Sequence, residues 1–237
     1  MTIIEYKGAM NSTVQFESGD IVYNIQYDNF KKGKVKNPYK KDIYNVACIG
    51  NTRNIKDKDL KYIYDGWHNM IERCYTQQQN YQSYQKENCS VCDEWLCFEN
   101  YYYWYKENHY TINDEIICLD KDILCHNLKL KDKIYSPETC LFVPQRINML
   151  FIKNNHNRID SSLPIGVRET QYHTYVSTCR DINNKQVRRY FKTVEEAFNF
   201  YKEQKEKLIK QFADKYKTKI PQKLYNALYN YKVEITE

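Results

Sequence analysis

The chain has 237 residues, and its 36 Lys and Arg against 30 Asp and Glu give a formal net charge of +6. No apolar run approaches the roughly 20 residues that a membrane helix needs, and Met1 is not followed by a secretory h-region, so neither a membrane nor an exported protein is expected. An aromatic share of 15% with only 6 Gly and 5 Pro excludes disordered and collagen-like chains. We therefore expect a cytoplasmic globular protein.

The first fifty residues predict a β module. Residues 13–17 and 20–27 alternate in polarity, and the stretch from Ser18 to Asp20 between them is typical of a hairpin turn. A basic run interleaved with aromatic residues follows, at Lys31, Lys32, Lys34 and Lys36. Lysine mainly holds phosphates, so these side chains are predicted backbone anchors for a nucleic acid, with a solvated face as the alternative. Residues 51–61 lack periodicity and predict a linker.

Two helices are predicted next, because apolar residues recur there at three- and four-residue steps. The first contains Tyr64, Trp67, Met70, Ile71 and Cys74, and the second spans residues 94–107. A short strand at residues 115–120, a polar loop at 121–136 and a strand at 140–143 follow. Pro144 is expected to open a helix whose buried face includes Ile147, since proline is tolerated in a first helical turn.

A polar linker at residues 153–162 is predicted to precede a C-terminal domain. Residues 165–169, 172–180 and 186–191 read as strands, and Thr193 with Glu196 forms a capping box that starts a long helix. Alternation places Tyr175 and Val176 on opposite faces of the middle strand. We expect Val176 to pack against the helix and Tyr175 to face outward.

The 9 cysteines are expected to be mainly buried thiols, because a cytoplasmic protein keeps them reduced. The one close pair is Cys89 and Cys92, with Cys97 nearby. Zinc needs a second ligand pair at similar spacing, and Cys118, Cys125 and Cys140 form none. A structural zinc site is therefore not predicted.

The ordered motifs of the middle and C-terminal parts resemble a known combination of families. The middle carries WHNMIERCY at 67–75, VCDEW at 91–95, LDKDIL at 119–124, YSPETCLFVP at 135–144 and RIN at 146–148. This set is similar to phage-type HNH endonucleases over residues 60–152. Residues 163–205, with GVR at 166–168 and FKTVEEA at 191–197, are similar to APETALA2-type DNA-binding domains. Residues 1–52 look like a β module that precedes such nucleases.

The HNH resemblance implies a ββα-metal nuclease that uses Mg²⁺ or Mn²⁺. Asp120, at the end of the first strand, would be the metal carboxylate, and Asn148, on the following helix, the distal ligand. The ion would neutralise charge that develops on the scissile phosphate. Two positions depart from the family pattern: Lys121 stands where the general-base histidine is expected, and Thr139 stands near the usual asparagine.

The identity of the general base stays open between several residues. Lys121 between two aspartates would stay charged, so it is a better phosphate clamp or ion-pair partner than a base. Asp122 is one candidate base, and His126 is another because histidine titrates near neutrality. An ordinary exposed loop histidine is the alternative for His126, and a solvated turn is the alternative for residues 120–122.

The APETALA2 resemblance implies a three-stranded sheet that binds the DNA major groove. The residues that it assigns to bases and phosphates are Arg168, Tyr175, Arg180, Arg188 and Arg189. Arginine pairs bidentately with guanine edges, which suits it for sequence readout.

The expected fold class is α+β: an N-terminal β module at 1–52, a ββα-metal core with added helices at 60–152, and a three-stranded sheet packed on one long helix at 163–237. The expected function is divalent-metal-dependent hydrolysis of phosphodiester bonds in double-stranded DNA by a homing or mobile-element endonuclease, with a monomer favoured. The alternative is a DNA-binding or regulatory protein whose HNH fold is inactive, because the Asp-His pair is missing. An RNA binder rests only on basic and aromatic composition.

Overall fold

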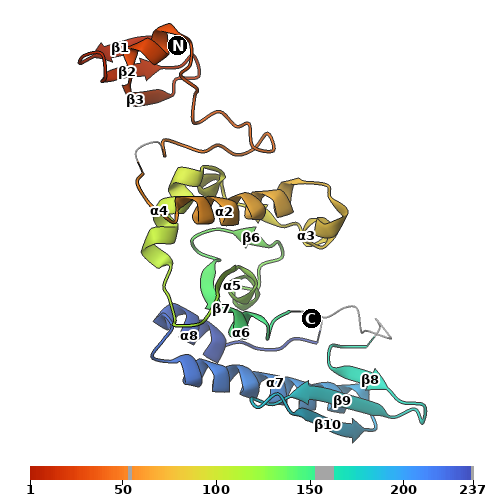
Figure 1. Cartoon of the computed structure of the whole chain (residues 1–237). Coiled ribbons are helices and arrows are strands. Elements are labelled where there is room, and N and C mark those ends of the chain that lie inside the picture. The colour runs from red at the N-terminus through yellow and green to blue at the C-terminus, as the bar shows by residue number, and fades with distance from the viewer. Residues whose placement is uncertain (53–54, 153–162, 236–237) are drawn as a thin grey trace. The chain divides into compact units, whose positions relative to one another are not determined.

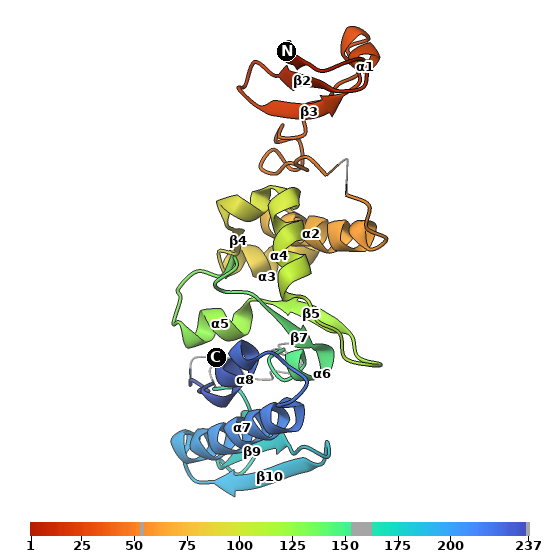
Figure 2. The same cartoon turned by 90° about the vertical axis from the view of Figure 1, so that its left-hand side faces the viewer.

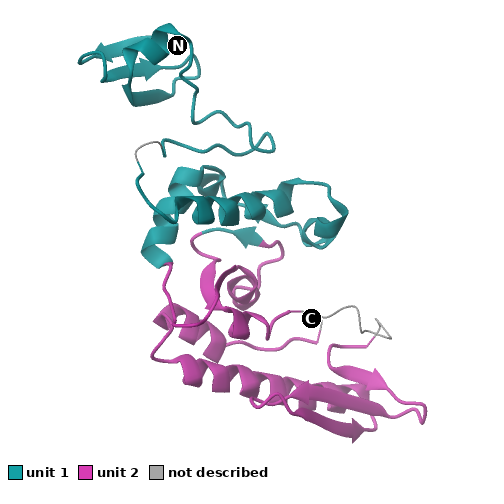
Figure 3. Cartoon of the chain, viewed as in Figure 1, with its two compact units in different colours: residues 1–108, 134–136 teal, residues 109–133, 137–237 magenta. Residues whose placement is uncertain are grey.

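The computed structural model describes residues 1–52, 55–152 and 163–235 and has a mixed α+β architecture, which confirms the predicted fold class (Figure 1). Backbone contacts divide the chain into two compact units (Figure 3). Unit 1 comprises residues 1–108 and 134–136, and unit 2 comprises residues 109–133 and 137–237. The predicted linker at 153–162 falls outside the described residues.

The N-terminal part of unit 1 is an antiparallel sheet of three strands in the order β1-β2-β3. These are β1 (Thr2–Tyr6), β2 (Ser12–Gln15) and β3 (Ile21–Ile25). The pair β2–β3 confirms the predicted hairpin, whereas β1 and the short helix α1 (Tyr27–Lys31) were not predicted. The sheet closes on a small core of four buried side chains: Val14, Val22, Ile25 and Val35.

The rest of unit 1 contains both predicted helices. Helix α2 (Leu60–Tyr75) overlaps the last two residues of the predicted linker, and α4 (Phe98–Asn108) packs against it. Trp67 is fully buried, and its indole N–H donates to the Trp95 carbonyl oxygen at 2.7 Å. Most aromatic residues here therefore form a core. Between the two helices lie η1 (Gln79–Tyr81), α3 (Gln82–Lys86), β4 (Ser90–Val91) and η2 (Asp93–Leu96), and β4 pairs with β6 (Ile134–Tyr135).

Unit 2 begins with a strand–helix–strand–helix succession. Strand β5 (Ile117–Asp120) pairs with β7 (Leu141–Pro144) in an antiparallel register that sets Asp120 opposite Leu141. The predicted loop 121–136 instead contains α5 (Asp122–Asn127) and, in unit 1, β6. Pro144 is the last residue of β7 rather than the first of a helix, and the following α6 (Gln145–Asn148) is a single turn. Its buried residue is Ile147, as predicted.

The C-terminal part of unit 2 is a three-stranded antiparallel sheet covered on one face by a long helix, as predicted (Figure 2). The strands are β8 (Val167–Glu169), β9 (Tyr175–Arg180) and β10 (Gln186–Phe191), and the helix is α7 (Val194–Tyr216). Both hydrogen bonds of the predicted capping box are present, and such a cap contributes about 1 kcal/mol. Gly166 has φ +77°, and a Cβ there would lie 2.1 Å from the Tyr201 ring, so only glycine fits.

One hydrophobic core runs through the whole of unit 2. The unpredicted helix α8 (Gln222–Tyr229) packs against both α5 and α7. Side chains from α5, β7 and α6 therefore share a cluster with side chains from the sheet and from α7 and α8: Ile123, Val143, Ile147, Cys179, Phe198, Ile209, Leu224 and Leu228. The compact units do not coincide with the modules predicted at 1–52, 60–152 and 163–237. That three-module organisation stays a prediction about sequence families.

Candidate nucleic-acid interface and carboxylate centre

Asp120 lies at the end of β5, where the chain turns into α5. Its side chain is buried, with 6% exposure, and Oδ1 accepts the backbone N–H of Ile123 at 3.0 Å. Among the described residues, Oδ2 accepts no hydrogen bond. Asp120 thus uses one carboxylate oxygen to satisfy a backbone N–H in the first turn of α5.

The electrostatic surroundings of Asp120 favour its protonated form. Burial raises the pKa of Asp120 from 3.8 to about 6, and the nearby Asp122 carboxylate adds to the rise. The hydrogen bond from Ile123 and the charge of Lys121 oppose it. A cation or a proton would therefore stabilise this carboxyl.

Two lysines hold the neighbouring Asp122. Lys121 Nζ lies 3.2 Å from both Asp122 carboxylate oxygens, although the Lys121 side chain is only 3% exposed. Lys133 Nζ donates to Asp122 Oδ1 from the far end of the segment that follows α5. Burial alone would raise the pKa of Asp122, but these two ammonium groups lower it below its usual value. Lys121 is thus placed as an ion-pair partner, which was one of its predicted roles, and Asp122 is charged but engaged.

His126 lies at the other end of α5, and its ring is occupied by the C-terminal segment. Nε2 is 2.6 Å from the backbone carbonyl oxygen of Lys232, and the imidazole stacks on Tyr231 with centroids 4.3 Å apart. A carbonyl oxygen only accepts, so Nε2 carries the hydrogen. That nitrogen is therefore not a free base, and the geometry gives His126 a structural contact. Its predicted catalytic role stays a prediction.

The donors near Asp120 only partly fit a divalent cation. Mg²⁺ is usually held by one or two carboxylates together with waters and phosphates, so the unused oxygen of Asp120 suits it. However, no hydrogen bond joins Asn148 to Asp120 within the described ranges, and α6 starts from the end of the hairpin opposite Asp120. Lys121 and Lys133 add two positive charges. In the part of the chain described, no group of three or more His, Cys, Asp or Glu could hold a metal ion. The predicted Mg²⁺ site at Asp120 and Asn148 stays a prediction.

The sheet of unit 2 gathers the second set of predicted residues. Cross-strand partners share a face, and the register pairs Arg168 with Val176 and Val176 with Tyr190. It also pairs Arg188 with Thr178, and Arg180 with Gln186. The other face carries Val167, Cys179 and Val187, which belong to the core beneath α7. The face turned away from α7 therefore presents Arg168, Arg180, Arg188 and Tyr190.

This arrangement corrects the predicted faces of β9. Val176 does not join the core beneath α7, and it is buried at 2% exposure between its cross-strand partners Arg168 and Tyr190. Tyr175 shares the face of Cys179 and is half-buried. The small side chains of Ser177 and Cys179 lie on the helix-facing side of β9. Hydrophobicity alone had favoured Val176 as the residue that packs against the helix. Tyr175 is thus on the wrong face for the predicted DNA contact.

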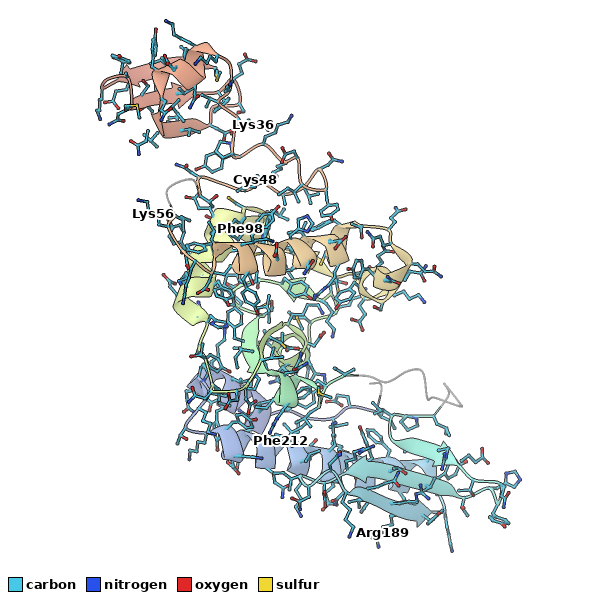
Figure 4. The ribbon with its side chains drawn as sticks, viewed as in Figure 1. Lys36, Cys48, Lys56, Phe98, Arg189 and Phe212 are labelled. Atoms are coloured by element: carbon cyan, nitrogen blue, oxygen red, sulfur yellow. The ribbon has the colours of Figure 1, made fainter. Side chains whose placement is uncertain are left out.

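The remaining predicted DNA-binding residues lie in different settings. Arg189, labelled on β10 in Figure 4, points its guanidinium over Phe191 and over Phe200 of α7, at 5.7 and 5.6 Å. It therefore lies on the helix-facing side, apart from Arg188. In unit 1, Lys31, Lys32, Lys34 and Lys36 are exposed at and after the end of α1, and Lys31 lies 5.2 Å above the Tyr27 ring.

Two residues of these sites were missed by sequence reasoning. Tyr190 is 61% exposed on the arginine-bearing face, and its spacing of two from Arg188 was a usable signal. Lys133 lies in a stretch without periodicity, so nothing in the sequence linked it to Asp122.

None of the described helices is both long and apolar enough to cross a membrane. No protein-family model, curated protein or solved structure matches this chain. The resemblance to HNH endonucleases and APETALA2-type domains therefore stays a prediction from the motifs.

Proposed function

We propose that this protein binds double-stranded DNA through the face of β8, β9 and β10 that is turned away from α7. The observation that carries the proposal is the register, which sets Arg168, Arg180 and Arg188 with Tyr190 on that one face. Arginine side chains on a sheet can pair with phosphates and with guanine edges in the major groove.

The neighbouring side chains favour a surface that approaches a polyanion. Arg180 Nη1 donates to Asn184 Oδ1 at 2.8 Å in the β9–β10 turn, which positions its guanidinium at the strand end. The four side chains of this face are paired with no acidic residue within the described ranges. Such a surface should attract DNA in a salt-dependent manner, since lysines and arginines release counterions from the duplex.

The second candidate adds hydrolysis: a DNA endonuclease that uses Mg²⁺ or Mn²⁺ at Asp120. Its support is a buried carboxylate at a strand end, with a raised pKa and one unused oxygen. A bound ion would supply charge neutralisation at the scissile phosphate, and Asp120 would orient it. The engagement of Asp122 by two lysines and of His126 by the Lys232 carbonyl favours the inactive alternative.

One pair of variants tests the binding surface. Arg168→Gln with Arg188→Gln should weaken binding of a labelled duplex and flatten the log–log salt dependence by about 1.8, because each lost phosphate contact contributes roughly 0.9. Arg189→Gln is the matched control, since Arg189 shares β10 but lies over Phe191 and Phe200. Equal effects of the double variant and the control would contradict the proposal.

The hydrolysis candidate has its own test. Wild-type protein and Asp120→Asn are incubated with plasmid and linear duplex in Mg²⁺ or Mn²⁺. Cleavage by wild type that is lost in the variant supports the endonuclease. Intact DNA with both proteins, at concentrations where the duplex is bound, supports the inactive DNA-binding protein.

A further inference from the structure

Unit 2 contains a cavity of about 960 Å³. Its lining residues come from two stretches of sequence, 124–133 and 223–234, and none belongs to the arginine-bearing sheet. One wall is formed by α5 and the segment after it, and the other by α8 and the C-terminal segment. Thirteen residues line it, and five of them are lysines: Lys129, Lys131, Lys133, Lys223 and Lys232. Among the described residues of this lining, Glu234 is the one acidic residue. The lining therefore carries an excess of positive charge.

The lysines differ in how far they are already engaged. Lys232 lies 3.4 Å from Glu206, and Lys223 donates to the Pro137 carbonyl oxygen at 3.3 Å. The side chains of Lys129 and Lys131 are exposed and make no ion pair or hydrogen bond with any described residue. Two lysines of the lining thus have unused donors, and an anionic ligand would supply acceptors for them.

The two walls are fastened to each other by polar contacts, so the cavity has a fixed frame. Asn127 Nδ2 donates to the Ala227 carbonyl oxygen at 2.8 Å, and His126 Nε2 donates to that of Lys232 at 2.6 Å. Both contacts join the end of α5 to α8 or to the segment after it. Asn226 and Asn230 add amide groups to the lining. A preformed frame reduces the ordering that a ligand must impose on binding.

Lys133 connects this cavity to the carboxylate centre. Its side chain lines the cavity, and its ammonium donates to Asp122. An anion held by Lys129 and Lys131 would therefore lie on the same segment after α5 as Lys133, the partner of Asp122. The lysines are spread over both walls, so a linear chain of phosphates fits them better than one compact anion does.

We propose that this lysine-lined cavity binds the phosphate backbone of a nucleic-acid strand, as a second contact besides the sheet. The inference rests on the proposed binding of DNA, but it concerns different residues and can fail separately. Its ligand is the sugar–phosphate chain itself, so contact here is independent of base sequence.

The test measures anisotropy of a labelled duplex, and of one of its strands, in EDTA so that no hydrolysis interferes. Lys129→Gln with Lys131→Gln should weaken binding by about tenfold and flatten the salt dependence by about 1.8. Lys223→Gln, on the opposite wall, should weaken it to a smaller extent. The matched control is Lys56→Gln with Lys58→Gln, which has the same spacing and charge change on exposed lysines of unit 1 (Lys56 is labelled in Figure 4).

The outcomes separate this inference from the proposed function. Loss of affinity in the cavity variants, with no loss in the control or in Arg168→Gln with Arg188→Gln, supports the cavity and contradicts the sheet. Unchanged affinity and salt slope in the cavity variants overturn the inference, whatever the sheet variants do. Inorganic polyphosphate as a competitor distinguishes the sources of phosphate: if it binds the cavity while the cavity variants bind both DNA probes normally, the nucleic-acid assignment is wrong.

Discussion

His126 donates a hydrogen bond of 2.6 Å from Nε2 to the carbonyl oxygen of Lys232, a residue 106 positions away in sequence. The same imidazole stacks on Tyr231, which is buried. Next in the chain, the backbone N–H of Val233 donates to Glu206 Oε1 at 3.1 Å. His126 and Glu206 therefore both hold the segment that follows α8.

We predict that His126→Ala loosens this segment and that His126→Phe does so less, because phenylalanine keeps the stacking and loses only the hydrogen bond. A hydrogen bond of this kind contributes about 1 kcal/mol, or roughly a fivefold change in an opening equilibrium. Amide hydrogen exchange at Val233 provides the measurement. Equal exchange in His126→Phe and wild type would show that the hydrogen bond contributes nothing to the segment's order.

The buried carboxyl of Asp120 predicts a fall in stability as pH rises. Its pKa in the folded protein is about 6 against the usual 3.8, so between these values the folded state keeps a proton that the unfolded state has lost. Its contribution to the free energy of unfolding is therefore fully present below the unfolded-state pKa of 3.8 and is lost as pH rises through the folded-state pKa of about 6. Two pKa units correspond to about 3 kcal/mol.

Asp120→Asn should remove that fall, because the amide stays neutral and can still accept the Ile123 N–H. Urea unfolding followed across both pKa values measures the effect. Glu107→Gln, which removes one exposed carboxylate, is the control and should leave the fall unchanged. A variant with Asn at 120 that loses stability over the same pH range as wild type would assign the effect to another group.

The ion pair between Lys121 and Asp122 predicts that the two residues are energetically coupled through their charges. Asp122→Asn should destabilise the protein by about 2 kcal/mol, because it removes one carboxylate partner of the buried Lys121 ammonium. Lys121→Met in the same background should restore part of the loss, because the ammonium that loses this ion pair is then absent. Chemical denaturation of the two single variants and the double variant measures the coupling. Additive losses would contradict it.

The two faces of the C-terminal sheet predict opposite roles for two tyrosines. Tyr190→Ala should weaken DNA binding severalfold with little change in stability, since its ring is 61% exposed beside the arginines. Tyr175→Ala should lower stability by about 1–2 kcal/mol and leave the surface intact, because it lies on the helix-facing side. Duplex affinity and thermal unfolding, measured on both proteins, separate the roles. The reverse pattern would restore the face first predicted for Tyr175.

Local signals made some of this fold readable from the sequence. Helix α7 has a strong start at Thr193 and a long apolar stripe, and both its place and its cap are as predicted. Trp67 and Phe98 lie in stretches where apolar residues recur at three- and four-residue steps, which is typical of the buried face of a helix, and both are buried. These elements depend on contacts within a few turns of chain, which periodicity captures.

The elements that were missed depend on distant partners. Helix α5 has six residues, too few to be stable alone, and it forms where Ile123 is buried in the core of unit 2 and Cys125 is also buried. Helix α8 is held through Leu224 and Leu228 in the same way. The faces of β9 were misassigned because alternation defines two sides without saying which one a helix covers. Lys133 meets Asp122 across a segment that carries no regular pattern.

The continuous core of unit 2 has a consequence for how such a gene can change by recombination. An exchange that replaced residues 163–237 with an unrelated domain would leave Ile123, Val143 and Ile147 without the side chains of α7 and α8 that share their core cluster. A successful recombinant would need an incoming segment that rebuilds that apolar surface. Under the proposed function, a change of DNA target would therefore be more accessible through point changes on the open face of the sheet, at Arg168, Arg188 and Tyr190, than through replacement of the whole segment.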